Sequence, residues 1–159
     1  MENNISIRNI TLDDTHHIIK WRNSEHVLNN FLDRNILTSE THNNWIMNFV
    51  QKEKVMQFII MVDNVSIGTT FIKNIDGDKS AEFGYFIGEQ HYLGKGIGTI
   101  AGKLTIEEYY KKFNKSIIAR AIKENIASNK ALTKIGFKFD YTYEVDRMKI
   151  NMFRYSGDK

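Results

Sequence analysis

Alternation of apolar and polar residues predicts seven strands, because successive side chains of a strand point to opposite faces of a sheet. The clearest segments are Ile5–Ile10, which alternates as a first strand would, and Ala81–Gly88, which is largely apolar. The pairs Asp63-Asn64 and Asp76-Gly77 are typical of hairpin turns. The predicted strands are Ile5–Ile10, Val55–Val62, Val65–Ile75, Ala81–Gly88, Ser116–Ile122, Phe137–Val145 and Met148–Tyr155.

Helical spacing of apolar residues begins after the first strand. Asp13 and Asp14 are suited to cap a helix in which Ile18, Ile19 and Trp21 recur at helical intervals. A second helical stretch covers residues 24–31. These two helices follow the first strand, and a third helix follows them before the second strand begins.

The third helix starts at Thr38 or Ser39, and Trp45, Phe49 and Met47 are expected to face inward. A long helix is predicted over residues 98–113 and a short one from residue 125 or 127 to residue 136. Strands mixed with helices in this order indicate an α/β (α+β) fold around one mixed central sheet. The strand–helix–strand segment 83–118 predicts one parallel pair of neighbouring strands.

Composition narrows the class of protein. The 159 residues, 42% of them hydrophobic, favour one globular domain with a substantial core, and no apolar run is long enough to span a membrane. The start, Met1–Asn4, lacks a basic and apolar signal segment, which predicts a cytoplasmic protein. Without cysteine there is no disulfide or thiolate, and the five histidines show no metal-binding spacing, so no metal is predicted. The net charge of +3 suits an anionic ligand such as a nucleotide cofactor better than nucleic acid.

The glycine-rich loop Leu93–Thr99 is the strongest candidate for a ligand site. Gly94, Gly96 and Gly98 alternate with other residues directly before the long helix. Glycine lets the backbone approach a ligand closely, and the first turn of a helix offers unpaired N–H groups with a partial positive charge. The loop therefore predicts a phosphate site made of main-chain donors, although an ordinary turn without ligand gives the same pattern. The spacing matches neither the P-loop nor the dinucleotide fingerprint.

Two motifs in this order resemble the GNAT acetyltransferase superfamily. The loop is similar to the Gln/Arg-x-x-Gly-x-Gly/Ala pyrophosphate loop, with Leu93 at its first position. Asn125-Ile126-Ala127-Ser128 followed by Lys134-Ile135-Gly136-Phe137 resembles the Asn-x-x-Ser…Lys-x-Gly-Phe signature. That version is typical of the branch containing ribosomal-protein N-terminal acetyltransferases. The resemblance implies a single domain over residues 1–159, a V-shaped splay between the fourth and fifth strands, and C-terminal strands that can pair two copies into a homodimer.

The resemblance also implies acetyl-CoA as the co-substrate. Backbone groups around the end of the fourth strand would pair with the pantetheine arm, the loop would hold the pyrophosphate, and the second motif would contact the arm and a phosphate. The cofactor-binding residues implied are Phe86, Ile87, Leu93, Gly94, Lys95, Gly96, Ile97, Gly98, Thr99, Asn125 and Lys130.

Acetyl transfer to an amine needs a proton acceptor and a proton donor. Glu82 is the candidate base, because it stands in an otherwise apolar strand where relatives carry a glutamate; an anchor for the amine and a solvated surface residue are the alternatives. Many relatives protonate the leaving thiolate with a tyrosine, but Leu132 occupies that position here. The branch with serine at position 128 can use that hydroxyl, so Ser128 is the candidate donor, with Tyr85, Tyr92 and Tyr141 as substitutes.

The N-terminal half is expected to shape the acceptor pocket. Its aromatic, basic and polar residues resemble a subgroup that acetylates amino sugars on nucleotide carriers, as in pseudaminic acid synthesis. An aromatic face would stack on the sugar or base, and Arg22 would pair with the diphosphate. A protein N-terminus, a polyamine or an aminoglycoside are the other acceptors considered, and a non-catalytic acetyl-CoA-binding module is the alternative of another class. The candidate substrate-binding residues are Trp21, Arg22, Asn23, Phe31, His42, Trp45 and Tyr85.

Overall fold

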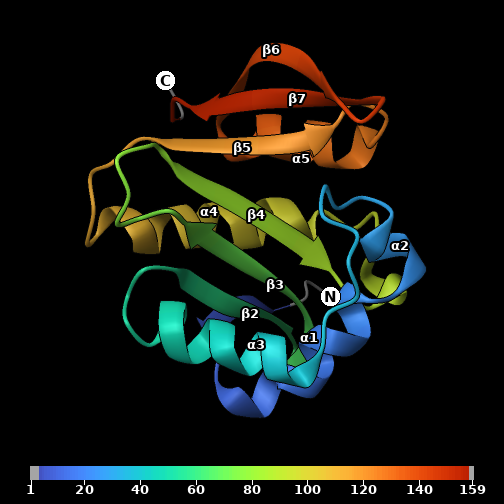
Figure 1. The fold of residues 1–159 in the computed structure, drawn as a ribbon, viewed down its shortest axis with the longest axis vertical. Coiled ribbons are helices and arrows are strands. Elements are labelled where there is room, and N and C mark those ends of the chain that lie inside the picture. Colours follow the sequence, from blue (N-terminus) through green and yellow to red (C-terminus); the bar gives the residue numbers. More distant parts are fainter. Residues whose placement is uncertain (1–3, 158–159) are drawn as a thin grey trace.

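A computed structural model describes residues 4–157 and places seven strands in one sheet (Figure 1). Residues 1–3, which belong to the segment used above to predict a cytoplasmic location, lie outside the described part. The strand order is β1-β2-β3-β4-β5-β7-β6, and β4–β5 is the parallel pair in an otherwise antiparallel sheet. The strands are β1 Ile5–Asn9, β2 Met56–Val62, β3 Val65–Lys73, β4 Ala81–Ile87, β5 Ile117–Ile122, β6 Phe137–Val145 and β7 Met148–Tyr155. The mixed sheet predicted from the sequence is confirmed.

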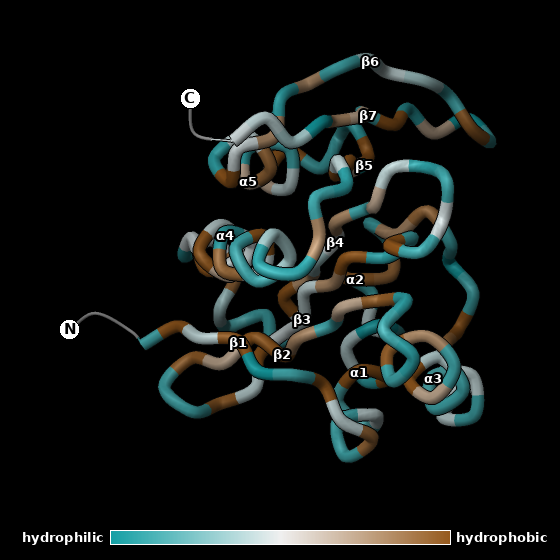
Figure 2. Tube along the Cα trace, turned by 90° about the vertical axis from the view of Figure 1, so that its left-hand side faces the viewer, coloured by the Kyte–Doolittle hydropathy of each residue, from teal (hydrophilic) through white to brown (hydrophobic). Residues whose placement is uncertain are grey.

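Helices lie on both faces of this sheet. Figure 2 shows α4 and α5 on one side and α1 and α3 on the other. Among residues 4–157, no helix is both long and apolar enough to cross a bilayer. The helices are α1 Thr15–Arg22, α2 Glu25–Leu28, α3 Ser39–Trp45, α4 Ile97–Tyr110 and α5 Ile126–Ile135, with short turns η1 Leu12–Asp14, η2 Ile46–Val50 and η3 Gln90–Tyr92.

The two helical layers explain why the central strands are apolar on both faces. In β2, Ile59 packs against the α1 side together with Ile18 and Trp21, whereas the next residue, Ile60, packs against the α4 side with Ile97. Strands buried on both faces form continuous hydrophobic runs. The sheet is therefore rigidly held where it has to position the residues of a site.

The parallel pair β4–β5 separates part-way along its length. Residues Ala81–Phe83 pair with Ile117–Ala119, and the rest of β4 continues to pair with β3 alone. The ends of β4 and β5 therefore diverge, as the resemblance implied for the fourth and fifth strands. This divergence opens a gap at the carboxyl end of β4, just before the glycine-rich loop.

The third helix buries a different face from the one predicted. Thr38 caps α3 by accepting the N–H of Thr41. Met47 and Phe49 were expected to face inward, but they are 45% and 42% exposed, and Ile46 is buried instead. The reason is that α3 continues into the π-helix η2, whose wider turn shifts the buried face.

Several predicted boundaries and one predicted cap also differ from the structure, and the long helix, for example, ends at Tyr110 rather than at residue 113. The second helix covers residues 25–28 only, and residues 29–38 form an extended connection to α3. Strand β3 ends at Lys73 because Asn74 takes a positive φ of 62°. Asp14 stands at the N-cap of α1, but its carboxylate accepts the N–H of Thr11 at 2.9 Å and pairs with Arg8 at 2.7 Å, so it caps η1 rather than α1.

Candidate active site

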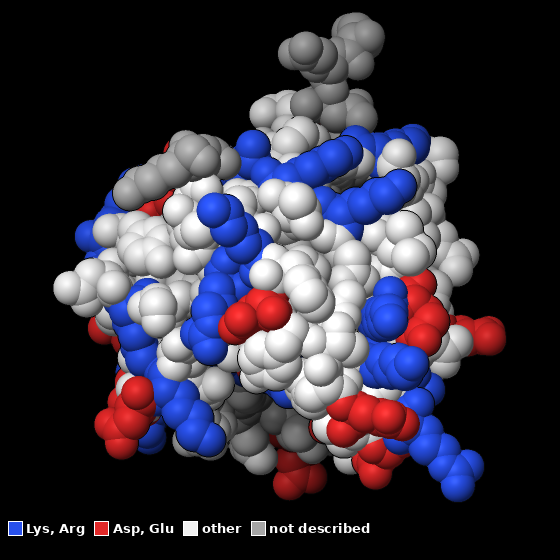
Figure 3. Space-filling model, turned by 90° about the horizontal axis from the view of Figure 1, so that it is seen from above, with Lys and Arg blue, Asp and Glu red and all other residues white. Residues whose placement is uncertain are grey.

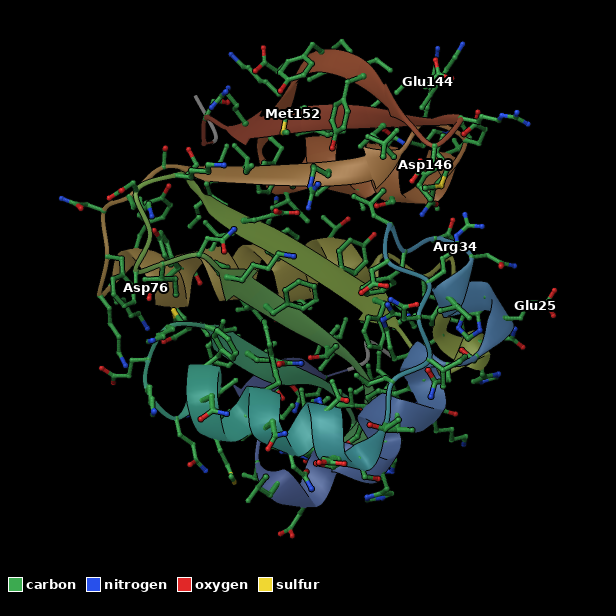
Figure 4. The ribbon with its side chains drawn as sticks, in the orientation of Figure 1. Glu25, Arg34, Asp76, Glu144, Asp146 and Met152 are labelled. Carbon is green, nitrogen blue, oxygen red and sulfur yellow. The ribbon has the colours of Figure 1, made fainter. Side chains whose placement is uncertain are left out.

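A cleft of about 620 Å³ occupies the gap between β4 and β5. Its floor is β4, its two ends are the glycine-rich loop and the start of α5, and its remaining wall is the end of α1 with the α2–α3 connection. Figure 4 labels Arg34 on this connection, and its Nη2 contacts the sulfur of Met148 at 3.5 Å. The connection therefore reaches from the N-terminal half to the start of β7 and closes one side of the cleft.

The glycine-rich loop presents main-chain groups to the cleft. Gly96 is the N-cap of α4 with φ 76°, and no side chain caps the helix there. Gly94 also has a positive φ, 72°, and a Cβ added at either glycine would meet no atom within 4 Å. The first-turn amides of α4 therefore face open space, which is the arrangement that suits a bound phosphate. Leu93, which replaces the usual polar residue, is 47% exposed and leaves the main chain accessible.

The N-terminus of α5 forms the opposite end of the cleft. Asn125 caps this helix by accepting the N–H of Ser128 at 3.3 Å, so its amide NH₂ group is the part left for a ligand. Ser128 and Lys130 also line the cleft. The residues assigned to the cofactor from the sequence, from Phe86 to Lys130, are thus all brought to one cleft.

Glu82 lies in β4 and is held by Arg120 of β5. Arg120 donates from Nε to Oε2 at 2.9 Å and from Nη2 to Oε1 at 3.2 Å, and its Nη1 contacts the hydroxyl of Tyr143 at 3.3 Å. Burial alone would disfavour charge on Arg120, but its bonds to Glu82 and Tyr143 outweigh this and raise its pKa. The carboxylate is thus fixed by a two-pronged, charge-assisted pair at the wall of the cleft.

Tyr85 faces the helix side of β4 and reaches α5. Its ring packs so closely on α4 that a Cβ at Gly98 would lie 2.6 Å from it. Tyr85 and Ser128 both line the cleft, and the Ser128 side chain lies close enough to Tyr85 to affect its pKa. Burial raises the pKa of Tyr85, and the nearby Ser128 side chain opposes this only in part. Tyr85 therefore keeps its proton at neutral pH, and Ser128 lies near it on the cleft wall.

The predicted acceptor residues divide into two groups. Arg22 and Phe31 line the cleft together with Tyr85. The other four lie away from its wall: Trp21 is 1% exposed and donates to Glu89, Asn23 exchanges hydrogen bonds with the backbone of Leu37, His42 is buried, and Trp45 donates to Gln57 at 2.9 Å. Their packing holds the N-terminal helices in place.

Arg120 is a residue of the site that was not predicted, although the sequence carries a signal for it. Arg120 is a lone charge in the otherwise apolar strand Ile117–Ile122, just as Glu82 is in β4. In the parallel register, Glu82 lies opposite Ile118, two residues before Arg120. Two single opposite charges in neighbouring apolar strands could have been read as a pair. His26, whose Nε2 lies 3.1 Å from the carbonyl oxygen of Ile87, is a second missed residue of the cleft.

Comparison with known proteins agrees with this geometry. The model of the acetyltransferase (GNAT) domain matches residues 4–138. The chain belongs to the GNAT acetyltransferase family. As a member of this family it is an acyltransferase that uses acetyl-CoA. In the described residues, no group of three or more His, Cys, Asp or Glu side chains could hold a metal ion.

Solved GNAT-like structures share the whole fold. A domain from Methanocaldococcus jannaschii is 26% identical with a TM-score of 0.79, covering 96% of this chain and 99% of that one. AAC(6')-Ib in complex with paromomycin and acetyl-CoA is 17% identical with a TM-score of 0.81, covering 97% and 94%. Spermidine N-acetyltransferase from Vibrio cholerae, in complex with CoA and spermine, is 14% identical with a TM-score of 0.82, covering 94% of each chain.

Proposed function

We propose that this chain transfers the acetyl group of acetyl-CoA to the primary amine of a small molecule, within one domain formed by residues 1–159. The observation that supports this most is that a single cleft is lined by the α4 cradle, by Glu82 with Arg120, and by Tyr85 with Ser128. Binding, proton removal and proton donation therefore have candidate groups in one place.

The cofactor is held mainly by the backbone. The amides of residues 97–99 bind the pyrophosphate, and the backbone around Phe86 and Ile87, at the end of β4 that β5 does not pair, binds the pantetheine arm. The carbonyl oxygen of Ile87 lies 3.1 Å from Nε2 of His26, so the N–H is the Ile87 group left for the arm. Asn125 binds the arm through its free NH₂ group, and Lys130 pairs with a phosphate. Bound there, acetyl-CoA supplies an activated acetyl thioester.

Glu82 receives the amine. A carboxylate has about four lone-pair positions, and the bidentate contact with Arg120 uses two of them. The remaining lone pairs of Glu82 bind the ammonium group of the substrate amine and take up one of its protons, which frees the nitrogen lone pair for attack. Arg120 acts as a positioning residue, because it fixes the rotamer of Glu82.

Ser128 donates its proton to the thiolate that leaves, and Tyr85 supplies the proton that Ser128 has given up. This pair takes the place of the tyrosine that relatives carry where Leu132 is buried here. The raised pKa of Tyr85 keeps its proton available at neutral pH.

We further propose an amino-sugar nucleotide as the acceptor, from the resemblance of the Trp21-Arg22-Asn23 segment. In this proposal Arg22, Phe31 and Tyr85 contact the acceptor. The solved neighbours contain other amines, paromomycin and spermine. Aminoglycosides, polyamines and protein N-termini are therefore the competing acceptors.

The first test is thiol release from acetyl-CoA with a panel of amines that includes each of these classes. Glu82→Gln should lower kcat/KM by about tenfold or more, since base catalysis typically contributes at least that much. Glu107→Gln, an exposed change on α4, is the matched control and should leave the rate unchanged. A Glu82→Gln rate within about threefold of wild type would refute the role of Glu82. Affinity for acetyl-CoA without thiol release for any amine would indicate a binding module instead.

A further inference from the structure

Arg22, at the end of α1, carries a buried charge. Its residue is 9% exposed, and its guanidinium lies 3.9 Å from the centre of the Phe31 ring. Nη2 donates to the backbone carbonyl of Asp33, whereas Nη1 is buried without a hydrogen-bond partner. None of the ion pairs among residues 4–157 includes Arg22. This side chain therefore holds a charge with no counter-charge bound to it.

Such an arrangement is unusual for a purely structural arginine. Exposed basic residues, such as those spread over the β6–β7 end of the molecule in Figure 3, are solvated and need no partner. A buried guanidinium has lost its water, so it is normally paired with a carboxylate or fully hydrogen-bonded. Burial indeed lowers the pKa of Arg22, and the charge of Asp33 opposes this only in part. A ligand that supplies the missing negative charge would remove this penalty.

The rest of the cleft has the same sign of charge. Its lining contains six Lys or Arg residues and two acidic ones. Glu82 is already paired with Arg120, and the exposed carboxylate of Asp33 accepts the N–H of Asn35 at 3.0 Å. On the wall away from the glycine-rich loop and α5, Lys73 of β3 adds to the charge of Arg22. Such a cleft repels a polycation and attracts an anion.

We propose that Arg22 binds an oxyanion of the acceptor, a phosphate or a carboxylate, so that the acceptor carries this anion in addition to its primary amine. The proposal rests on the proposed function, because it concerns the acceptor of the same cleft. A guanidinium suits such a group because its planar array of N–H donors matches two oxygens at once. Phe31 lies over the guanidinium and also lines the cleft, so its ring is the group that moves to admit the anion.

Charge at both ends then selects the acceptor. Glu82 takes the cationic amine and Arg22 takes the anion, so a molecule with both groups satisfies both walls. Polyamines and aminoglycosides offer only cations and leave Arg22 without a partner. This chain is therefore expected to differ in acceptor class from the structural neighbours that contain spermine or paromomycin.

Matched acceptors test this selection. We would compare kcat/KM for glucosamine 6-phosphate against glucosamine, and for β-alanine against its amide, with spermine and paromomycin as polycations. At least one anionic member should be favoured about tenfold or more over its neutral partner, and the polycations should react most slowly. The pair that shows the preference tells phosphate from carboxylate. Equal rates within each pair, or faster reaction of the polycations, would overturn the proposal.

A binding measurement separates this proposal from the proposed function. With coenzyme A saturating the enzyme, titration calorimetry with phosphate or acetate should show binding to wild type that Arg22→Gln weakens at least about tenfold. Lys20→Gln removes an exposed charge from the same helix and should change nothing. Equal binding in wild type and Arg22→Gln, or none in either, would refute the anion site even if acetyl transfer is observed. If Arg22→Gln does not fold, Arg22→Lys keeps the charge, loses the two-pronged geometry and should show the same loss.

Discussion

The two ends of the cleft use different parts of the polypeptide. The cofactor end is made of main-chain amides from one contiguous loop, residues 93–99, and of one helix N-terminus. The acceptor end is made of side chains from α1, the α2–α3 connection, β3, β4 and β5. A main-chain site is readable from a local motif, because it needs only the right backbone conformation. A side-chain site depends on how distant segments pack, so the residues of the acceptor end were predicted less accurately from the sequence than those of the cofactor end.

The largest expected effect is at the cofactor end. Gly96→Val puts a branched side chain at a residue with φ 76° and into the open space before α4. Left-handed backbone costs a residue with a Cβ about 1–2 kcal/mol, and the valine also covers the amides. The KM for acetyl-CoA should rise about 30-fold or more, measured by steady-state thiol release.

Gly77→Val, in the exposed turn after β3, is the control for adding a valine away from the cleft and should leave this KM unchanged. A KM for Gly96→Val close to that of wild type would mean that side chains rather than amides hold the cofactor. The difference between the two ends of the cleft would then disappear.

An intermediate effect is expected at the junction of the two ends, where Tyr85 meets Ser128. Ser128→Ala and Tyr85→Phe should each lower kcat about tenfold with little change in the KM for acetyl-CoA, since each variant loses one proton donor and no group that binds the cofactor. The phenylalanine keeps the ring that packs on Gly98. Because the two hydroxyls act in series, the double variant should be little worse than either single one.

Tyr141→Phe is the control, because Tyr141 is an exposed hydroxyl on β6 that does not line the cleft. Normal turnover by Ser128→Ala would remove this residue from the mechanism. A Tyr141→Phe defect larger than that of Tyr85→Phe would move the donor to β6.

The smallest effect concerns His42, which packs behind the acceptor end. Burial lowers the pKa of His42 below 6.5, so the unfolded chain takes up a proton at a higher pH than the folded one. His42 therefore makes the free energy of unfolding fall as the pH drops through 6.5, by up to about 1.4 kcal/mol per pH unit. Denaturant unfolding from about pH 7.5 to about pH 5.5 should show a shallower fall for His42→Gln than for wild type.

Exposed His91→Gln should follow the wild-type curve. An identical fall in stability for wild type and His42→Gln would show that His42 is not buried as a neutral group. Loss of acetyl transfer in His42→Gln at unchanged stability would return His42 to the acceptor-binding residues proposed from the sequence.

The fold could be predicted because each strand and helix has its own local signal. The alternation in β1 and the two-residue turn at Asp63-Asn64, whose residues both have positive φ, needed no tertiary information. The buried face predicted for the third helix was wrong at Phe49, which lies in the π-helix η2. The spacing of apolar residues does not indicate a π-turn. The sequence could place the elements but not this local change in winding.

The same division holds for the candidate site. The glycines of the loop face open space as their motif predicts. Trp21 and Trp45 were predicted to contact the acceptor, but their indole N–H groups donate hydrogen bonds to Glu89 and Gln57. Whether a large aromatic residue faces a cleft or the core depends on the partners that packing brings to it, and no spacing in the sequence records those partners.

The most direct test of the main-chain cradle is a calorimetric titration of acetyl-CoA into three proteins: wild type, Gly96→Val and Arg22→Gln. We expect saturable binding at one site in wild type, the same binding in Arg22→Gln, and a loss of affinity of about 30-fold or more in Gly96→Val. No heat with wild type at about 1 mM acetyl-CoA, or unchanged binding by Gly96→Val, would contradict the account.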